Sequence, residues 1–138
     1  MNRQDAKVAK RAEPSAAVDQ MARGVIGAAI EVHRVLGPGF LESVYEEAVA
    51  IELAVRNIPF ERQVAIGVEY RGQQVGEGRL DLLVGGALIV ELKAVEALAP
   101  IHTAQVISYL KTTGRLLGLL INFNVPVLKE GIRRIVLT

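Results

Sequence analysis

Residues 78–93 read GRLDLLVGGALIVELK, and this stretch decides the fold of the chain. Two apolar runs stand on either side of the glycine pair, a pattern that predicts a β-hairpin. Asp81 lies in the first run, and Glu91 and Lys93 lie in the second. Side chains two apart on a strand point to the same face, so Glu91 and Lys93 are expected side by side. Because burying a lone charge is costly, these charges must be paired, bound to a metal or open to a cleft.

The length of the hairpin loop determines whether the two acids meet. A two-residue loop would put Asp81 and Glu91 on opposite faces of the sheet, whereas the three-residue loop Gly85-Gly86-Ala87 sets them opposite each other. Three-residue hairpin loops with a glycine in the left-handed region are common, so we predict this loop. Two acids and a lysine at one spot are the groups that hold a divalent cation and stabilise charge at a phosphate.

The composition is that of one globular domain. The chain has 138 residues, of which 51% are apolar and 22% are charged, and this length supports a sizeable core. We expect residues 1–16 to form a mobile tail and residues 17–138 to form a single domain. The absence of cysteine excludes disulfides and thiolate metal sites and suits the cytoplasm, where we place the protein. No secretory signal or membrane span is recognisable, and we expect no membrane contact. A net charge of +1 argues against tight, nonspecific coating of DNA.

The spacing of apolar residues predicts the other elements. A period near 3.6 indicates helices over residues 17–36 and 41–56, the second with an apolar stripe of Val44, Ala48, Ile51 and Val55. Alternation then predicts strands over residues 60–70, 75–84 and 87–94. A third helix over residues 100–113 opens at Pro100, and strands follow over residues 117–122 and about 127–137.

This order of elements predicts an α/β fold with a mixed sheet. The first three strands form an antiparallel meander. The helix over residues 100–113 crosses over, so that the strand over residues 117–122 lies parallel to an earlier strand. Helices then cover the faces of the sheet.

Four short motifs occur in order along the chain. Asp81 with Glu91-x-Lys93 resembles the signature of the PD-(D/E)XK nuclease superfamily, and Gly78-x-x-Asp81 and Gln105-x-x-x-Tyr109 extend it to a RecB-like motif series. Residues 39–45, GFLESVY, are similar to the signature of the small GxxExxY proteins, which are grouped in that superfamily. The resemblance covers about residues 21–137 and implies a restriction-endonuclease-like core.

The resemblance implies a metal-dependent nuclease, with DNA as the expected substrate. Asp81, Glu91 and the backbone carbonyl of Leu92 would hold Mg²⁺, for which Mn²⁺ can substitute. Lys93 would orient a water molecule or stabilise developing negative charge. Glu42 would be a further catalytic acid and candidate metal ligand.

Three other residues are candidates for binding substrate or orienting the groups around the metal. Gln105 and Tyr109 are four apart and therefore share one helix face. Tyr45 lies three residues after Glu42 on the same helix face. Each has a structural alternative: a solvated helix face for Gln105 and Tyr109, core packing for Tyr45, and stabilisation by the helix dipole for Glu42.

Two other interpretations of the whole chain stay open. One is a noncatalytic nucleic-acid-binding or scaffold module that keeps the fold, in which Glu91 and Lys93 form a mutual ion pair. The other is a subunit that needs a partner, with a homodimer as the simplest form, because small domains gain groove length by dimerising.

Overall fold

The computed structural model describes residues 13–137, so most of the predicted tail, residues 1–12, lies outside the described residues. The first described helix, α2 (Ala16–Leu36), begins one residue earlier than predicted. Its start is fixed by Ser15, whose side chain accepts a hydrogen bond from the Val18 N–H at 3.2 Å. The helix ends at Gly37, where φ is +71°.

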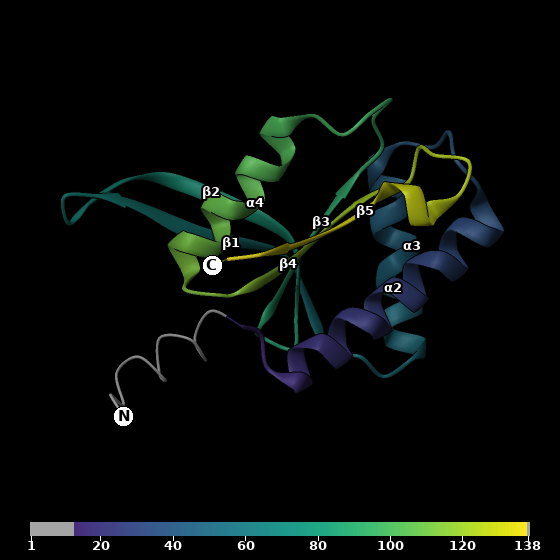
Figure 1. The fold of residues 1–138 in the computed structure, drawn as a ribbon, viewed down its shortest axis with the longest axis horizontal. Helices are drawn as coiled ribbons and strands as arrows, with labels where there is room; N and C mark the ends of the chain where they lie inside the picture. Colours follow the sequence, from purple (N-terminus) through teal and green to yellow (C-terminus); the bar gives the residue numbers. More distant parts are fainter. Residues whose placement is uncertain (1–12, 138) are drawn as a thin grey trace.

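Five strands form one sheet in the spatial order β1-β2-β3-β4-β5 (Figure 1). They are β1 (Phe60–Tyr70), β2 (Gln73–Val84), β3 (Leu88–Lys93), β4 (Leu117–Asn122) and β5 (Ile132–Val136). Neighbouring strands are antiparallel, except that β3 and β4 are parallel. The predicted meander and the predicted parallel strand are therefore confirmed.

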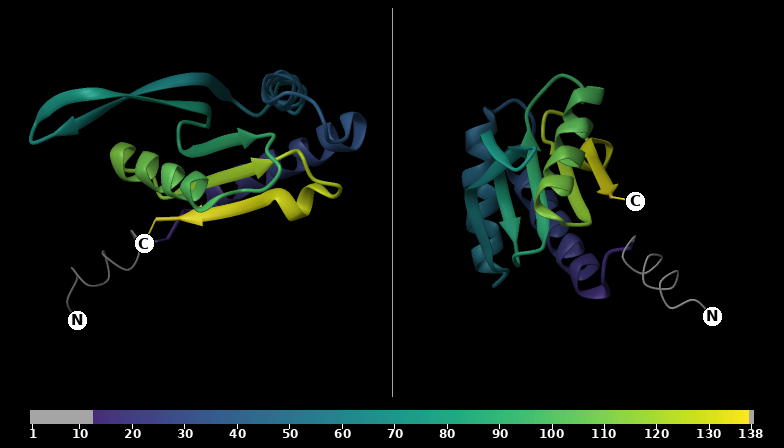
Figure 2. Two further views of the ribbon diagram at one scale, coloured as in Figure 1. Left: turned by 90° about the horizontal axis from the view of Figure 1, so that it is seen from above. Right: turned by 90° about the vertical axis from the view of Figure 1, so that its left-hand side faces the viewer.

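Helices cover both faces of the sheet. One face packs against α2 and α3 (Glu42–Val55), and the other packs against α4 (Pro100–Thr113). Figure 2 shows this layering, with α4 on the opposite side of the strands from α2 and α3. The end of the β1–β2 hairpin projects beyond the rest of the sheet (Figures 1 and 2).

Ala48 packs against the core, but the rest of the apolar stripe predicted on the second helix is not its buried face. On α3 the side chains of Val44, Ile51 and Val55 are 38%, 64% and 69% exposed. The residues that face the core are instead Tyr45, Val49, Ala50 and Leu53. Both stripes have helical spacing, and contact with the sheet selects the one that carries the large aromatic side chain.

The last strand is shorter than predicted. Residues Leu128–Gly131 form a 3₁₀ helix, η1, and only Ile132–Val136 pair with β4. Gly131 packs directly against the backbone carbonyl of Asn122 and leaves no space there for a side chain.

The hairpin between β2 and β3 has the predicted three-residue loop. Val84 pairs with Leu88, which leaves Gly85, Gly86 and Ala87 as the turn. Gly85 and Gly86 have φ values of +58° and +69°, in the left-handed region that glycine adopts without steric cost. This register brings Asp81 and Glu91 level with each other.

None of the described helices combines the length and the apolarity that crossing a membrane requires.

Candidate metal centre

Asp81 and Glu91 meet where β2 and β3 separate. The last paired residues of the two strands are Leu82 and Val90, one position before the acids. Beyond this pair, side chains replace the backbone ladder. The Asp81 N–H donates to Glu91 Oε2 at 2.7 Å, and the Leu92 N–H donates to Asp81 Oδ2 at 2.8 Å. The acids therefore satisfy the backbone groups of each other's strands, and each has a second oxygen with no backbone donor.

A twist in β2 opens the sheet at Asp81. Residues two apart on a strand normally share a face. Leu82 belongs to the core beneath α2 and α3, but Leu80 belongs to the core beneath α4. The opposing position on β1, Gln63, has φ +51° and is missing from the β1–β2 pairing. β2 and its neighbour β1 are thus both distorted at the level of Asp81.

Burial has a strong effect on the protonation of Glu91. Glu91 is only 3% exposed. Desolvation, together with the nearby Asp81 charge, raises the pKa of its side chain to about 8. Burial also raises the pKa of Asp81, although the hydrogen bond from the Leu92 N–H opposes this change. At neutral pH without a metal, Glu91 is therefore mostly protonated.

Lys93 faces the same side of β3 as Glu91 but is not fastened to it. Among the described residues, no ion pair joins Lys93 to any acid. Its charge nevertheless lowers the pKa values of Asp81, Glu91 and Glu42, which places it within electrostatic reach of all three. The alternative of a closed Glu91–Lys93 ion pair is not what the structure contains.

Glu42 approaches the acids from the first turn of α3. The N-cap residue of this helix is Leu41, which provides no side-chain cap hydrogen bond. Burial raises its pKa, with smaller contributions from the charges of Asp81 and Glu46, while Lys93 lowers it. Within the described residues, however, no three His, Asp or Glu side chains already lie close enough to share a metal ion. Glu42 is thus an electrostatic neighbour of the acid pair rather than a member of a finished cluster.

Tyr45 has a structural position. It is fully buried, and its ring stacks on Phe123 with centroids 4.5 Å apart. Its hydroxyl donates to the Gly37 carbonyl at 2.6 Å and accepts from the Phe40 N–H at 3.2 Å. These contacts hold the turn that precedes Glu42, which favours the structural alternative for Tyr45.

The two candidates on α4 lie on the side of the sheet to which Glu91 points. Glu91 follows Ile89 by two residues, and Ile89 belongs to the core beneath α4. Tyr109 packs over Gly78, where an added Cβ would lie 2.8 Å from the tyrosine ring. Gln105 is exposed, and no hydrogen bond joins it to the acids in the described part of the chain. Gly78, the glycine of the Gly78-x-x-Asp81 motif, therefore allows Tyr109 to approach β2 closely.

Both histidines are engaged by backbone groups. His33 Nε2 donates to the Val125 carbonyl at 2.8 Å, and His102 Nδ1 accepts from the Ala99 N–H at 2.9 Å at the start of α4. Through these bonds they hold loops in place, and in the described part of the chain neither belongs to a group of three side chains that could share a metal ion.

The sequence did not single out Glu46 or Gln63. Glu46 lies one helical turn after Glu42, and its charge contributes to the raised pKa of Asp81. The spacing of the two acids on α3 was a usable signal. Gln63 had none, because a polar residue in an alternating strand is ordinary.

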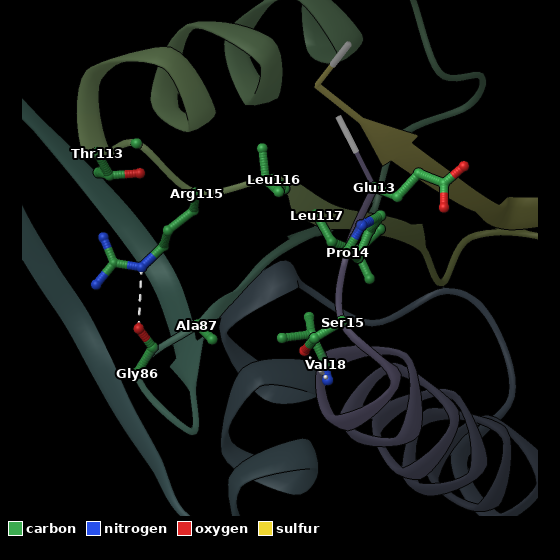
Figure 3. A pocket seen from close by; sticks show the side chains of 11 residues that line it. Glu13, Pro14, Ser15, Val18, Gly86, Ala87, Thr113, Arg115, Leu116 and Leu117 are labelled. Atoms are coloured by element: carbon green, nitrogen blue, oxygen red, sulfur yellow. Dashed lines mark hydrogen bonds between the residues drawn. The ribbon is translucent and has the colours of Figure 1, made fainter. Parts of the chain in front are cut away.

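A pocket of about 490 Å³ lies at the other end of β3 (Figure 3). It is lined by Gly86 and Ala87 of the hairpin loop and by residues 113–117, and Arg115 Nε donates to the Gly86 carbonyl at 3.1 Å. It contains none of the candidate site residues.

Taken together, a five-stranded mixed sheet between helices, with acids on two adjacent strands and a lysine two residues beyond the second, defines the restriction-endonuclease-like class of folds. The family model described as PD-(D/E)XK nuclease superfamily matches residues 19–135. The chain belongs to this superfamily. No similar curated protein or solved structure was found.

Proposed function

We propose that this protein is a metal-dependent nuclease of the GxxExxY group that hydrolyses phosphodiester bonds in nucleic acid, with DNA as the expected substrate. The observation that carries the proposal is the meeting of Asp81 and Glu91 at the open end of the hairpin. Membership of the nuclease superfamily supports it.

The donor set fits Mg²⁺ or Mn²⁺. Both ions prefer oxygen ligands, and Mg²⁺ keeps several waters, so two carboxylates and one carbonyl suffice. Asp81, Glu91 and the Leu92 carbonyl would supply these oxygens, with Glu42 as a further candidate. When bound, the cation would neutralise phosphate charge and lower the pKa of a coordinated water molecule.

The protein's own groups would prepare the site for this cation. The backbone hydrogen bonds to Asp81 Oδ2 and Glu91 Oε2 fix both carboxylates before any ligand arrives. Such preorganisation reduces the cost of binding. Lys93 would hold a positive charge where negative charge develops on the phosphate. Gln105 and Tyr109, above the same face, would contact substrate.

Cleavage of plasmid and oligonucleotide DNA with Mg²⁺ or Mn²⁺ tests the proposal. We expect Asp81→Asn and Lys93→Ala to abolish cleavage, while the control variants Glu77→Gln and Lys111→Ala, both at exposed positions, retain it. Equal cleavage by the wild type and Asp81→Asn would identify a contaminant and remove the proposal.

The alternative is a noncatalytic nucleic-acid-binding or scaffold module. The burial of Glu91 favours it, because a protonated acid at 3% exposure is also a stable structural element. Calorimetry separates the two functions. A wild-type protein that binds no Mn²⁺ at millimolar concentration would support the scaffold. We expect a cytoplasmic location for either function. If the protein instead acts as a homodimer, light scattering would reveal the doubled mass.

A further inference from the structure

Gln63 has an unusual backbone conformation for its place in the fold. It lies inside β1 with φ +51°. The other two non-glycine residues with positive φ in the described chain lie at ends of elements: Asn57 follows α3, and Arg71 is in the turn after β1. A left-handed residue other than glycine is uncommon and persists only where its surroundings hold it. The surroundings of Gln63 therefore indicate what its conformation achieves.

The first effect of this conformation is a missing ladder bond. The Gly85 N–H donates to the Pro59 carbonyl, and hydrogen-bonded pairs recur every two residues along antiparallel strands. Counting from this pair makes Gln63 and Asp81 a hydrogen-bonded position, yet they are absent from the pairing. The Gln63 carbonyl instead accepts from Arg79 Nη1 at 3.2 Å. The Asp81 N–H, released from β1, is the donor that fastens Glu91.

The second effect concerns the side chain. Gln63 Nε2 donates to Glu46 Oε1 at 2.7 Å. The other Glu46 oxygen accepts hydrogen bonds from Arg62 at 3.0 and 3.1 Å. Two successive residues of β1, Arg62 and Gln63, therefore bind the same acid of α3. Glu46 lies one turn after Glu42 on α3. The same link therefore fixes the position of Glu42 relative to the twisted part of the sheet.

We infer that Gln63 is a positioning residue of the acid site: its left-handed backbone withholds a carbonyl from Asp81, which frees the Asp81 N–H to hold Glu91, while its amide links the distorted part of β1 to Glu46 of α3. As a role in metal binding, this inference rests on the proposed function. The backbone arrangement can be tested without any metal.

Two variants of Gln63 separate the backbone from the amide. Gln63→Gly keeps the left-handed conformation accessible and removes the amide. Gln63→Val also removes the amide but disfavours positive φ, because valine is β-branched and fits a regular strand. Gln73→Val, at an exposed position at the start of β2, is the matched control.

Scalar couplings across hydrogen bonds in the metal-free protein identify the acceptor of the Asp81 N–H. We expect a coupling to the Glu91 side-chain carboxyl carbon in the wild type, in Gln63→Gly and in the control. In Gln63→Val we expect this coupling to be replaced by one to the backbone carbonyl of position 63. Unchanged coupling in a folded Gln63→Val protein would overturn the inference.

Calorimetric titration with Mn²⁺ tests the consequence for the site. We expect the dissociation constant to rise about threefold in Gln63→Gly and at least about tenfold in Gln63→Val, with no change in the control. If Gln63→Val does not fold, Gln63→Gly decides alone, and wild-type Mn²⁺ affinity in that variant would overturn the role of the amide. A wild type that binds no Mn²⁺ removes the proposed function, and the couplings still decide whether Gln63 places the acids.

Discussion

Replacing Glu91 by glutamine should stabilise the protein at neutral pH and remove part of its pH dependence. Burial raises the pKa of Glu91 from 4.5 to about 8. In the unfolded chain the group ionises near 4.5, so between pH 4.5 and pH 8 the folded state binds the extra proton. This proton stabilises the fold fully below pH 4.5, and the stabilisation is lost as pH rises through 8.

The size of the effect follows from the gap between these two pKa values. At about 1.36 kcal/mol per pH unit, about 3 kcal/mol of the unfolding free energy should be lost between pH 5 and pH 7.5. Glutamine resembles the protonated acid, and its side-chain oxygen can still accept from the Asp81 N–H. Glu91→Gln should therefore match the wild type within about 1 kcal/mol at pH 5 and exceed it by about 3–4 kcal/mol at pH 7.5.

Urea unfolding in the presence of a chelator, at both pH values, measures this difference. Acids that do not interact with Glu91 contribute equally to both proteins and cancel in the comparison. Glu77→Gln, at an exposed position on the projecting hairpin, serves as the control and should leave the pH dependence unchanged. Parallel stability profiles for the wild type and Glu91→Gln would refute the argument that Glu91 is held protonated.

Three further predictions concern metal binding, charge and the interhelical turn. Because the metal must displace the proton on Glu91, Mn²⁺ affinity should rise up to about tenfold per pH unit between pH 6 and pH 7.5 and level off above 8, and calorimetry in buffers of different ionisation enthalpy should detect about one released proton. Lys93→Ala should leave Mn²⁺ affinity unchanged or tighter while DNA cleavage falls at least about 100-fold, whereas loss of metal affinity would assign the lysine a structural role. Tyr45→Phe should lower the unfolding free energy by about 1–2 kcal/mol, because the Gly37 carbonyl loses its donor, and a wild-type stability would contradict the contact.

The hairpin was predictable because its register depends on parity. A loop of Gly85, Gly86 and Ala87 leaves one arrangement in which Asp81 and Glu91 face each other, and the structure has that arrangement. The parallel placement of β4 followed from the crossover through α4, since a helix-length connection cannot form a hairpin.

Other features depended on contacts that a single sequence does not display. α3 carries two apolar stripes, and only packing against the sheet selects Tyr45 and its neighbours over the stripe that contains Ile51. The distorted residue Gln63 is hydrogen-bonded to Arg79 and Glu46, which are 16 and 17 residues away along the chain. A regularly alternating strand sequence contains no signal for such long-range hydrogen bonds.

The two hydrogen bonds between the backbone and the side chains of Asp81 and Glu91 have a consequence for the interpretation of similar chains. Asp81 and Glu91 accept N–H groups that the ladder leaves without backbone partners, so they would be retained by natural selection for folding alone. A relative without the proposed nuclease activity would still need both carboxylates, or amides of the same shape. Lys93 makes no ion pair among the described residues and has no such structural role, so its loss would be the earlier sign that a relative lacks the proposed activity.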